Sequence, residues 1–205
     1  IERYTGIKPF DLANFTTAPK HVTFVARQDR LWYRWPLFKF AHRAIRRAGL
    51  GNLLNGLFVA DQECLIRRSM TRIRRSHPGI TFSIVGLGEA RHYPADVKDL
   101  RTMRMNTAVE RSWCEAYARS QLVVGVHGSN MLLPTALAAG CVEILPHDRQ
   151  GNVVQDISVR YNDRMQLFLY RFVDEFARPV EIDRQVSAIF DHFNLFERNN
   201  RINIF

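Results

Sequence analysis

The stretch that most constrains the fold runs from Gln121 to Pro146 and reads QLVVGVHGSNMLLPTALAAGCVEILP. Its first part, Leu122–Val126, is a short apolar run, typical of a strand buried on both faces. The segment Met131–Ala139 has helical character, and a second apolar run, Cys141–Leu145, follows it. Strand, turn, helix and strand in this order form the unit that builds a parallel sheet. The stretch therefore predicts an α/β protein with a mainly parallel, Rossmann-like sheet flanked by helices.

The turn between this strand and helix reads His127-Gly128-Ser129-Asn130. Gly128 permits a sharp turn, and Ser129 or Asn130 can cap the helix, whose first N–H groups favour an anion. We interpret the turn as a phosphate-binding site, with His127 as a candidate catalytic residue. The alternative is an ordinary α/β connection with a structural histidine. Neither G-x-G-x-x-G nor G-x-x-x-x-G-K-[ST] is present, which disfavours dinucleotide-dependent dehydrogenases and Walker-type NTPases.

Earlier in the chain, the run Val22–Ala26 predicts a strand that ends at Arg27, with Asp29 and Arg30 just beyond it. The carboxyl ends of parallel strands lie along one edge of a sheet, where ligands bind. We therefore expect Arg27 to face the same cleft as the 127–130 turn, and either arginine to bind a diphosphate. Asp29 is a candidate for orienting an arginine or acting as a base. The alternative is a solvated cluster of arginine and aspartate.

Further candidates follow other predicted strands. The strand Ile80–Val85 ends at Gly86, which allows close approach of a ligand or simply forms a loop. Glu143 interrupts an apolar strand, and a buried carboxylate requires a partner. We expect Glu143 to bind ribose hydroxyls or to pair with an arginine. His147 and Asp148, past the end of that strand, are candidates for contacting a sugar.

Two arginine-bearing helices are expected early in the chain. Pro36 suits the first turn of a helix over Leu37–Ala48, whose apolar residues, Leu37 included, keep helical spacing and predict an inward face. A helix over Gln62–Ser76 carries five outward arginines, which form either a solvated face or a nucleic-acid site. No aromatic residue is interleaved with them to stack on bases, so we expect the solvated face.

The remaining segments complete the predicted organisation. Residues 1–20 form an irregular lead-in, residues 21–195 one α/β domain, and residues 196–205 a tail. The expected elements are a strand or loop at Gly56–Ala60, a loop at Glu89–Arg104, helices at Thr107–Ser120, Val153–Asn162 and Asp183–Asn194, and a strand at Gln166–Val173.

Composition limits the possible classes. A chain of 205 residues that is 46% hydrophobic can form one substantial core or two small ones. Three dispersed cysteines show no metal-ligand spacing, so neither a disulfide framework nor a zinc site is expected, and Cys114 and Cys141 should be core residues. No apolar run reaches the ~20 residues of a transmembrane helix. The net charge of +9 comes mainly from arginine, which reflects either phosphate recognition or genomic codon bias.

The sequence VVGVHGSNMLLPTALAAGCVEILP resembles the strand, His-Gly turn, helix and Glu-Ile strand of family 61 glycosyltransferases. The segments VTFVARQDR and DISVRYNDRMQLFLYRFVD lie in similar order on either side. The resemblance covers approximately Val22–Asp174, and its specific part is the His-Gly turn. That family usually reads His-Gly-Ala-Gly-Leu-Thr-Asn at this point, and the second glycine is absent here.

The resemblance implies the donor-binding half of a two-domain GT-B enzyme that inverts at the anomeric carbon. The implied activity is transfer of a sugar from a nucleotide donor, UDP-linked by expectation, to a glycan, protein or other hydroxyl acceptor. The phosphate-binding candidates are then Arg27, Arg30 and the 128–130 turn, and a second domain or subunit would complete the site. No metal is expected, because the sequence contains no Asp-x-Asp motif.

Two other classes of function remain open at this point. One is a module that binds a polyanion or nucleic acid, and the other is a catalytically inactive subunit that binds a nucleotide sugar. We expect a cytoplasmic protein, compatible with association with a membrane. The Golgi or endoplasmic reticulum lumen is the alternative in a eukaryote.

Overall fold

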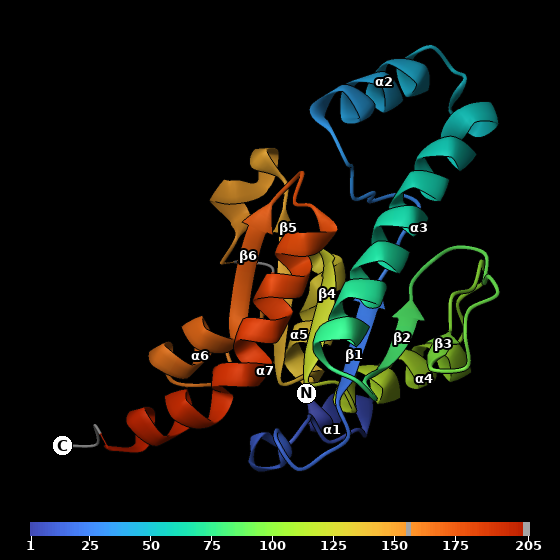
Figure 1. The fold of residues 1–205 in the computed structure, drawn as a ribbon. Helices are drawn as coiled ribbons and strands as arrows, with labels where there is room; N and C mark the ends of the chain where they lie inside the picture. The colour runs from blue at the N-terminus through green and yellow to red at the C-terminus, as the bar shows by residue number, and fades with distance from the viewer. Residues whose placement is uncertain (155–156, 203–205) are drawn as a thin grey trace.

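The computed structural model describes residues 1–154 and 157–202. Within this part of the chain, six strands form one all-parallel sheet in the order β3-β2-β1-β4-β5-β6 (Figure 1). This arrangement confirms the predicted Rossmann-like α/β fold. The strands are β1 His21–Val25, β2 Thr81–Val85, β3 Val97–Asp99, β4 Leu122–Val126, β5 Gly140–Leu145 and β6 Tyr170–Asp174.

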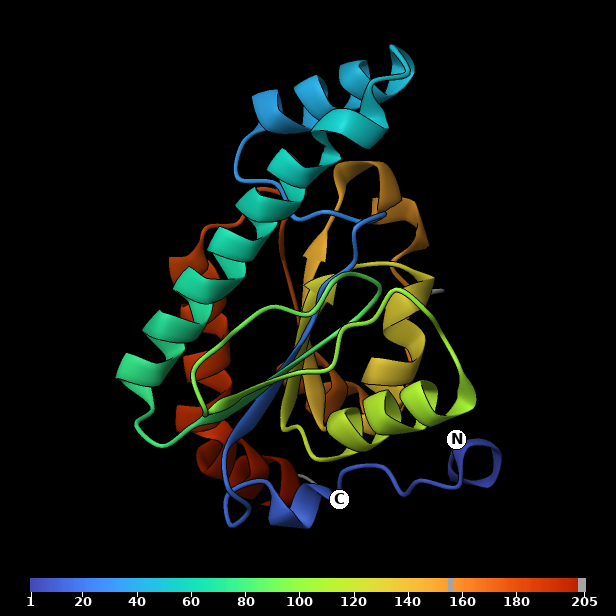
Figure 2. The ribbon, with the colours of Figure 1, turned by 90° about the vertical axis from the view of Figure 1, so that its right-hand side faces the viewer.

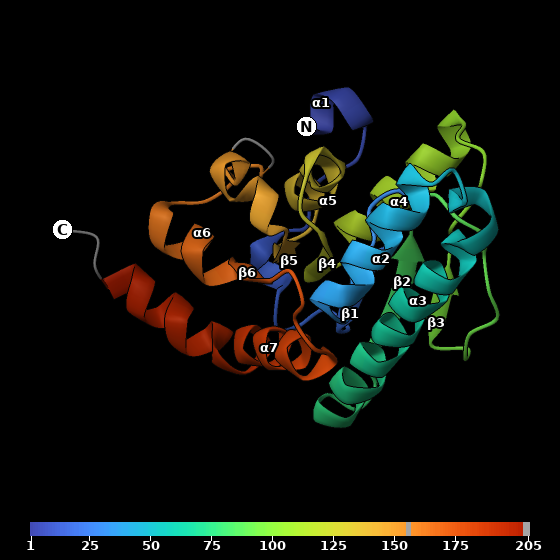
Figure 3. The same cartoon turned by 90° about the horizontal axis from the view of Figure 1, so that it is seen from above.

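Helices cover both faces of the sheet. α3 and α7 pack against each other on one face, and α4 and α5 lie together on the other (Figures 2 and 3). Among the described residues, none of the helices has the length and apolarity required to cross a bilayer. The helices are α1 Glu2–Thr5, α2 Pro36–Arg47, α3 Gly51–Ser76, α4 Thr107–Ala118, α5 Leu132–Leu137, α6 Asp163–Leu169 and α7 Pro179–Ile202.

The centre of the sheet is the pair β1 and β4, and every residue of both strands is buried. This explains the continuous apolar sequence of β4, since a strand covered on both faces has no solvent side. The two buried polar side chains of β1, His21 and Thr23, lie within hydrogen-bond distance of Ser83 and Ser120. β1 pairs with β4 from Val22 opposite Leu122 to Val25 opposite Gly125. The chain builds outward from β1 towards β3 and from β4 towards β6. The strand order therefore reverses between β1 and β4, which is where open parallel sheets bind ligands.

Several predicted element boundaries are wrong. Gly56–Ala60 belongs to α3, because Phe58 and Val59 bury against Leu31 in a small apolar cluster beside α2. Within Glu89–Arg104, residues Val97–Asp99 pair with β2 as a short edge strand.

The C-terminal third also differs from expectation. The described parts of Val153–Asn162 are not helical, and residues 155–156 lie outside the described residues. Asn162 instead caps α6, its Oδ1 accepting from Met165 N at 3.0 Å, so the predicted strand at Gln166–Val173 begins as a helix and becomes β6 at Tyr170. α7 continues through residues 196–202, which were expected as a tail; residues 203–205 lie outside the described residues.

The inward face predicted for α2 is partly wrong. Ala41 and Ile45 pack against the small cluster as expected, but Leu37 is 77% exposed. Leu37 lies one turn before Ala41 on the same side of the helix, but it is not among the residues that pack against that cluster.

Candidate functional site

Arg30 connects the two central strands at their carboxyl ends. Its Nη1 donates to Asn130 Oδ1 at 2.7 Å, and its Nη2 donates to Ser129 Oγ at 3.4 Å. Nη1 also lies 3.5 Å from the His127 carbonyl oxygen. The structure thus brings together residues about one hundred positions apart, as the parallel-sheet argument required. The arginine that reaches the turn is Arg30.

Gly128 shows how closely charge approaches this turn. Its φ of +143° is a conformation that favours glycine. A methyl group added here would lie 1.5 Å from Arg30 Nη1 and 2.8 Å from Arg149 Nη1. Two guanidinium groups therefore converge on one glycine, and no described carboxylate pairs with Arg149. Two neighbouring cations beside a glycine turn form a site suited to an anion such as a phosphate.

Arg149 was not among the residues selected from the sequence. It lies in the short helical segment His147–Asn152, which follows β5 at the same edge of the sheet. Its position after a strand was a usable signal. Its convergence with Arg30 depends on the tertiary fold and could not be seen in the sequence.

The helix that follows the turn contributes less than expected. The chain forms a three-residue 3-10 turn, Ser129–Met131, and α5 has only six residues. Asn130 does not cap it, since its Nδ2 donates to Val126 O at 3.3 Å and its Oδ1 accepts from Arg30. The positive charge at this site comes chiefly from the arginines.

A buried pair lies beneath the turn. His127 Nδ1 and Glu143 Oε2 are 2.5 Å apart, and both side chains are 0% exposed. His127 directly follows β4 and Glu143 lies on the adjacent β5. His127 N extends the pairing of these strands by donating to Ile144 O at 2.9 Å. The sequence led us to expect that Glu143 would bind ribose hydroxyls or pair with an arginine, and in the structure this buried carboxylate contacts His127. A carboxylate bonded to one ring nitrogen fixes the orientation of an imidazole, so Glu143 anchors the start of the turn.

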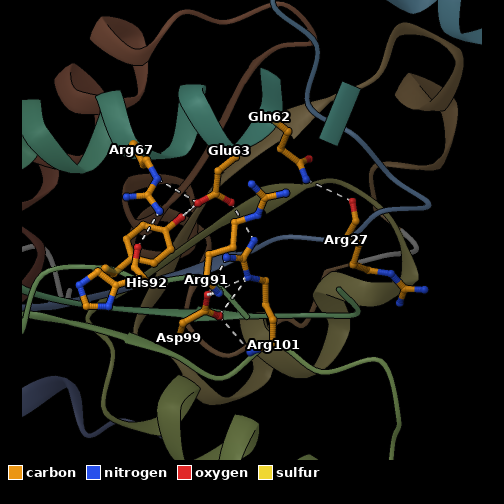
Figure 4. A network of polar contacts seen from close by, with 9 residues as sticks. Arg27, Gln62, Glu63, Arg67, Arg91, His92, Asp99 and Arg101 are labelled. Carbon is orange, nitrogen blue, oxygen red and sulfur yellow. Dashed lines mark hydrogen bonds and ion pairs between the residues drawn. The ribbon is translucent and has the colours of Figure 1, made fainter. Parts of the chain in front are cut away.

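Arg27 and Asp29 form a two-point ion pair with each other. Arg27 Nε lies 2.7 Å from Asp29 Oδ1, and Nη2 lies 2.8 Å from Oδ2. These hydrogen bonds lower the pKa of Asp29 and raise the pKa of Arg27. The Arg27 carbonyl also accepts a hydrogen bond from Gln62 at 3.2 Å (Figure 4). The orienting role predicted for Asp29 thus acts on Arg27.

Gly86 is explained by packing. Its φ is +130°, and a methyl group there would lie 1.8 Å from the Ala26 carbonyl oxygen. The close approach expected at this glycine is made by the backbone that follows β1. Gly86 therefore lets the ends of β1 and β2 lie side by side.

His147 and Asp148 belong to a neighbouring charged cluster. His147 Nε2 lies 2.8 Å from Asp174 Oδ2, and this hydrogen bond raises the pKa of His147. Burial opposes ionisation of Asp148, but the charges of Lys39 and Arg43 outweigh it and lower the pKa of that carboxyl. The cluster is largely neutralised within itself. Residues 1–154 and 157–202 contain no grouping of three or more His, Cys, Asp or Glu suited to a metal ion.

The fold and this geometry define the class: a Rossmann-like α/β domain with two arginines over a glycine turn at the point where the strand order reverses. No protein-family model matches the chain, and no curated protein matches it either.

Proposed function

We propose that this domain binds the diphosphate of a nucleotide sugar at the Gly128 turn, between Arg30 and Arg149. The observation that carries the proposal is the convergence of the two guanidinium groups on Gly128. Its place between β1 and β4, where the strand order reverses, supports a nucleotide ligand. The His-Gly turn, with its resemblance to family 61 glycosyltransferases, supports an inverting transfer of the sugar to a hydroxyl of a glycan or protein.

In this reaction, the acceptor oxygen bonds to the anomeric carbon while the bond from that carbon to the diphosphate oxygen breaks. The nucleoside diphosphate leaves with an additional negative charge, and the acceptor's proton passes to a base. Arg30 and Arg149 stabilise the leaving charge, because fixed cations act most strongly where charge develops. Two guanidinium groups supply the positive charge that a bridging metal would otherwise provide.

The two candidate bases have different roles in this proposal. Asp29 is held ionised by Arg27 and its pKa is lowered, which makes it a weak proton acceptor. His127 is fully buried and bonded to Glu143, so we assign it to positioning the turn. A second domain or subunit would then supply the base that takes the acceptor's proton.

Calorimetric titration with UDP and uridine tests the proposal. Arg149→Ala should weaken UDP binding by about tenfold or more, since a charge-assisted hydrogen bond contributes roughly 1.5–3 kcal/mol. Uridine binding should change little. Arg149→Lys should recover only part of the loss, because it lacks the planar fork. Arg111→Ala, which removes an exposed arginine of α4, is the matched control.

Equal losses for UDP and uridine, or no UDP binding by the wild type, would refute the diphosphate site. UDP binding without donor hydrolysis or sugar transfer by the full-length protein would instead identify an inactive nucleotide-sugar-binding subunit.

A second candidate function rests on α3. Arg68, Arg72 and Arg75 are exposed at helical spacing, and no described carboxylate pairs with them. Together with Arg178 they line a cavity of about 940 Å³ between α3 and the start of α7. None of its lining residues belongs to the Gly128 site. This surface favours a polyanion.

A DNA duplex distinguishes the two functions. Polyanion binding should weaken steeply with salt, in proportion to the phosphates contacted. Replacing Arg68, Arg72 and Arg75 with glutamine should reduce that slope by about one for each lost contact. Duplex binding that is insensitive to this triple change would exclude the α3 surface.

A further inference from the structure

The outer face of α2 carries an apolar stripe. Leu37 and Phe40 are each 77% exposed, and Trp35, immediately before the helix, is 57% exposed. Ala44 and Ala48 are exposed as well and continue the stripe at helical spacing. Single exposed apolar residues are common on proteins, but a contiguous aromatic and aliphatic stripe indicates a surface that binds something.

The face of α2 that adjoins the stripe is firmly packed. Ala41 and Ile45 contact the small apolar cluster formed with α3. His42 is buried; its Nδ1 lies 2.7 Å from the Tyr33 hydroxyl and its Nε2 3.0 Å from Asn55 Oδ1. These contacts fix the rotation of the helix. The packing of the helix therefore determines that Leu37 and Phe40 point outward.

The surroundings of the stripe are basic. The segment from Leu31 to Ala60 contains five arginines and lysines and no aspartate or glutamate. Arg46 and Arg47 are exposed, and no described carboxylate pairs with either. Arg43 lies 3.3 Å from Asp148, in a pair whose members are both more than half exposed. Such a pair contributes little and leaves the arginine available to an external anion.

The hairpin of α2 and the start of α3 projects beyond the carboxyl edge of the sheet (Figures 1 and 2). Leu50, between the helices, and Leu57, on α3, add exposed apolar area at 49% and 64%. An element that projects from the domain can reach an extended surface.

We propose that the α2–α3 hairpin, Trp35–Leu57, binds the surface of an anionic lipid membrane. Leu37 and Phe40 insert at the boundary between headgroups and acyl chains, and Arg43, Arg46 and Arg47 contact lipid phosphates. An exposed apolar face flanked by arginines is the pattern of helices that lie in the membrane interface. The complete lack of acidic residues in this segment favours an anionic bilayer over a protein partner. This inference is independent of the nucleotide site.

Co-sedimentation with two kinds of vesicle tests the inference, with no nucleotide present. Wild type should bind vesicles of phosphatidylcholine mixed with phosphatidylglycerol much more tightly than vesicles of phosphatidylcholine alone. Each arginine among Arg43, Arg46 and Arg47 that is changed to glutamine should weaken that binding about fivefold. The double change Leu37→Ser and Phe40→Ser should weaken it by about tenfold or more.

The control is Leu167→Ser on α6, which removes a leucine that is 73% exposed and should leave binding unchanged. The melting temperature of the double variant should equal that of the wild type, because both side chains are exposed. Failure of the wild type to bind anionic vesicles, or unaltered binding by the double variant, would overturn the proposal. Self-association lost in the double variant, without vesicle binding, would also overturn it and assign the stripe to a protein interface.

Discussion

Arg101 and Arg149 carry the same guanidinium group in opposite surroundings. Arg101 is 5% exposed and lies between two buried carboxylates, 2.8 Å from Glu63 and 2.6 Å from Asp99 (Figure 4). Tyr93 also donates to Glu63, and the Arg91 backbone donates to Asp99. Arg149 pairs with no described carboxylate and lies over a glycine turn beside a second arginine.

The comparison distinguishes an arginine that stabilises the fold from an arginine that is a candidate for binding a ligand. The network around Arg101 neutralises its own charge and connects α3, the 89–104 segment and the edge strand β3. At the Gly128 turn two guanidinium groups lie together, and no described carboxylate pairs with Arg149. In a protein this rich in arginine, the useful criterion is therefore whether the protein itself satisfies the guanidinium.

The largest expected effect comes from Arg101→Ala. This change leaves the buried carboxylate of Asp99 without Arg101 and leaves Glu63 paired with the partly exposed Arg67. Breaking a buried ion pair costs about 3–5 kcal/mol of stability. Urea unfolding should show that loss, whereas Arg149→Ala should change the free energy of unfolding by less than about 0.5 kcal/mol. Similar free energies of unfolding for Arg101→Ala and Arg149→Ala would contradict this distinction between the two arginines.

Glu143→Gln probes a carboxylate that is buried and contacts His127 at the start of the proposed binding turn. Removing the carboxylate that orients His127 should cost about 1–3 kcal/mol. UDP affinity should fall as well, since the turn loses its anchor. Glu115→Gln, in an exposed pair with Arg111 on α4, should change neither the stability nor the UDP affinity. A Glu143 variant with wild-type stability and affinity would remove the His127–Glu143 pair from both roles.

The stability contributed by the Arg101 network should fall at low pH. Burial opposes ionisation of Asp99, but hydrogen bonds from Arg101 and from backbone N–H groups outweigh it and lower the pKa of that carboxyl. Its stabilising contribution is complete above the unfolded pKa of about 3.9 and is lost as pH falls through the lower folded value. Asp99→Asn should flatten the fall in stability below pH ~4. An unaltered acid profile would mean that other carboxyls dominate it.

The smallest effect is expected from Arg27→Ala. Its pair with Asp29 is partly exposed, and such pairs contribute about 0.2–1 kcal/mol. From the sequence we expected this arginine to face the phosphate-binding turn, but the structure directs Arg30 and Arg149 there. UDP titration of Arg27→Ala, Arg30→Ala and Arg149→Ala ranks the three arginines by their contribution to UDP affinity. A loss at Arg27 equal to that at Arg149 would restore the first interpretation.

The sheet was predictable because buried parallel strands are continuous apolar runs, and four of its strands were found from that signal. β3 was not, since three residues that include Lys98 and Asp99 carry no such pattern. The start of α3 was missed because Gly56 interrupts its helical character. Leu37 was placed inward because helical spacing reveals a stripe but not which layer covers it.

The sequence predicted which edge of the sheet carries the candidate site, but not every residue that forms it. Parallel strands bring the residues after β1 and β4 together, and this argument located Arg30 and the 127–130 turn correctly. Which arginine reaches the turn depends on the backbone path after Val25, where strand alternation ends. The partner of Glu143 depended on the strand register, which aligns it beside β4.

β3 has a consequence for solubility. It is only three residues long and closes one side of the sheet, with Lys98 exposed and Asp99 held by Arg101. Without it, β2 would present the unpaired backbone of Thr81–Val85, an apolar strand that could add to the strand of another molecule. The Arg101 network holds the 89–104 segment in place, so its loss would expose that edge. Weakening this cluster should therefore produce aggregates before it produces a soluble unfolded chain.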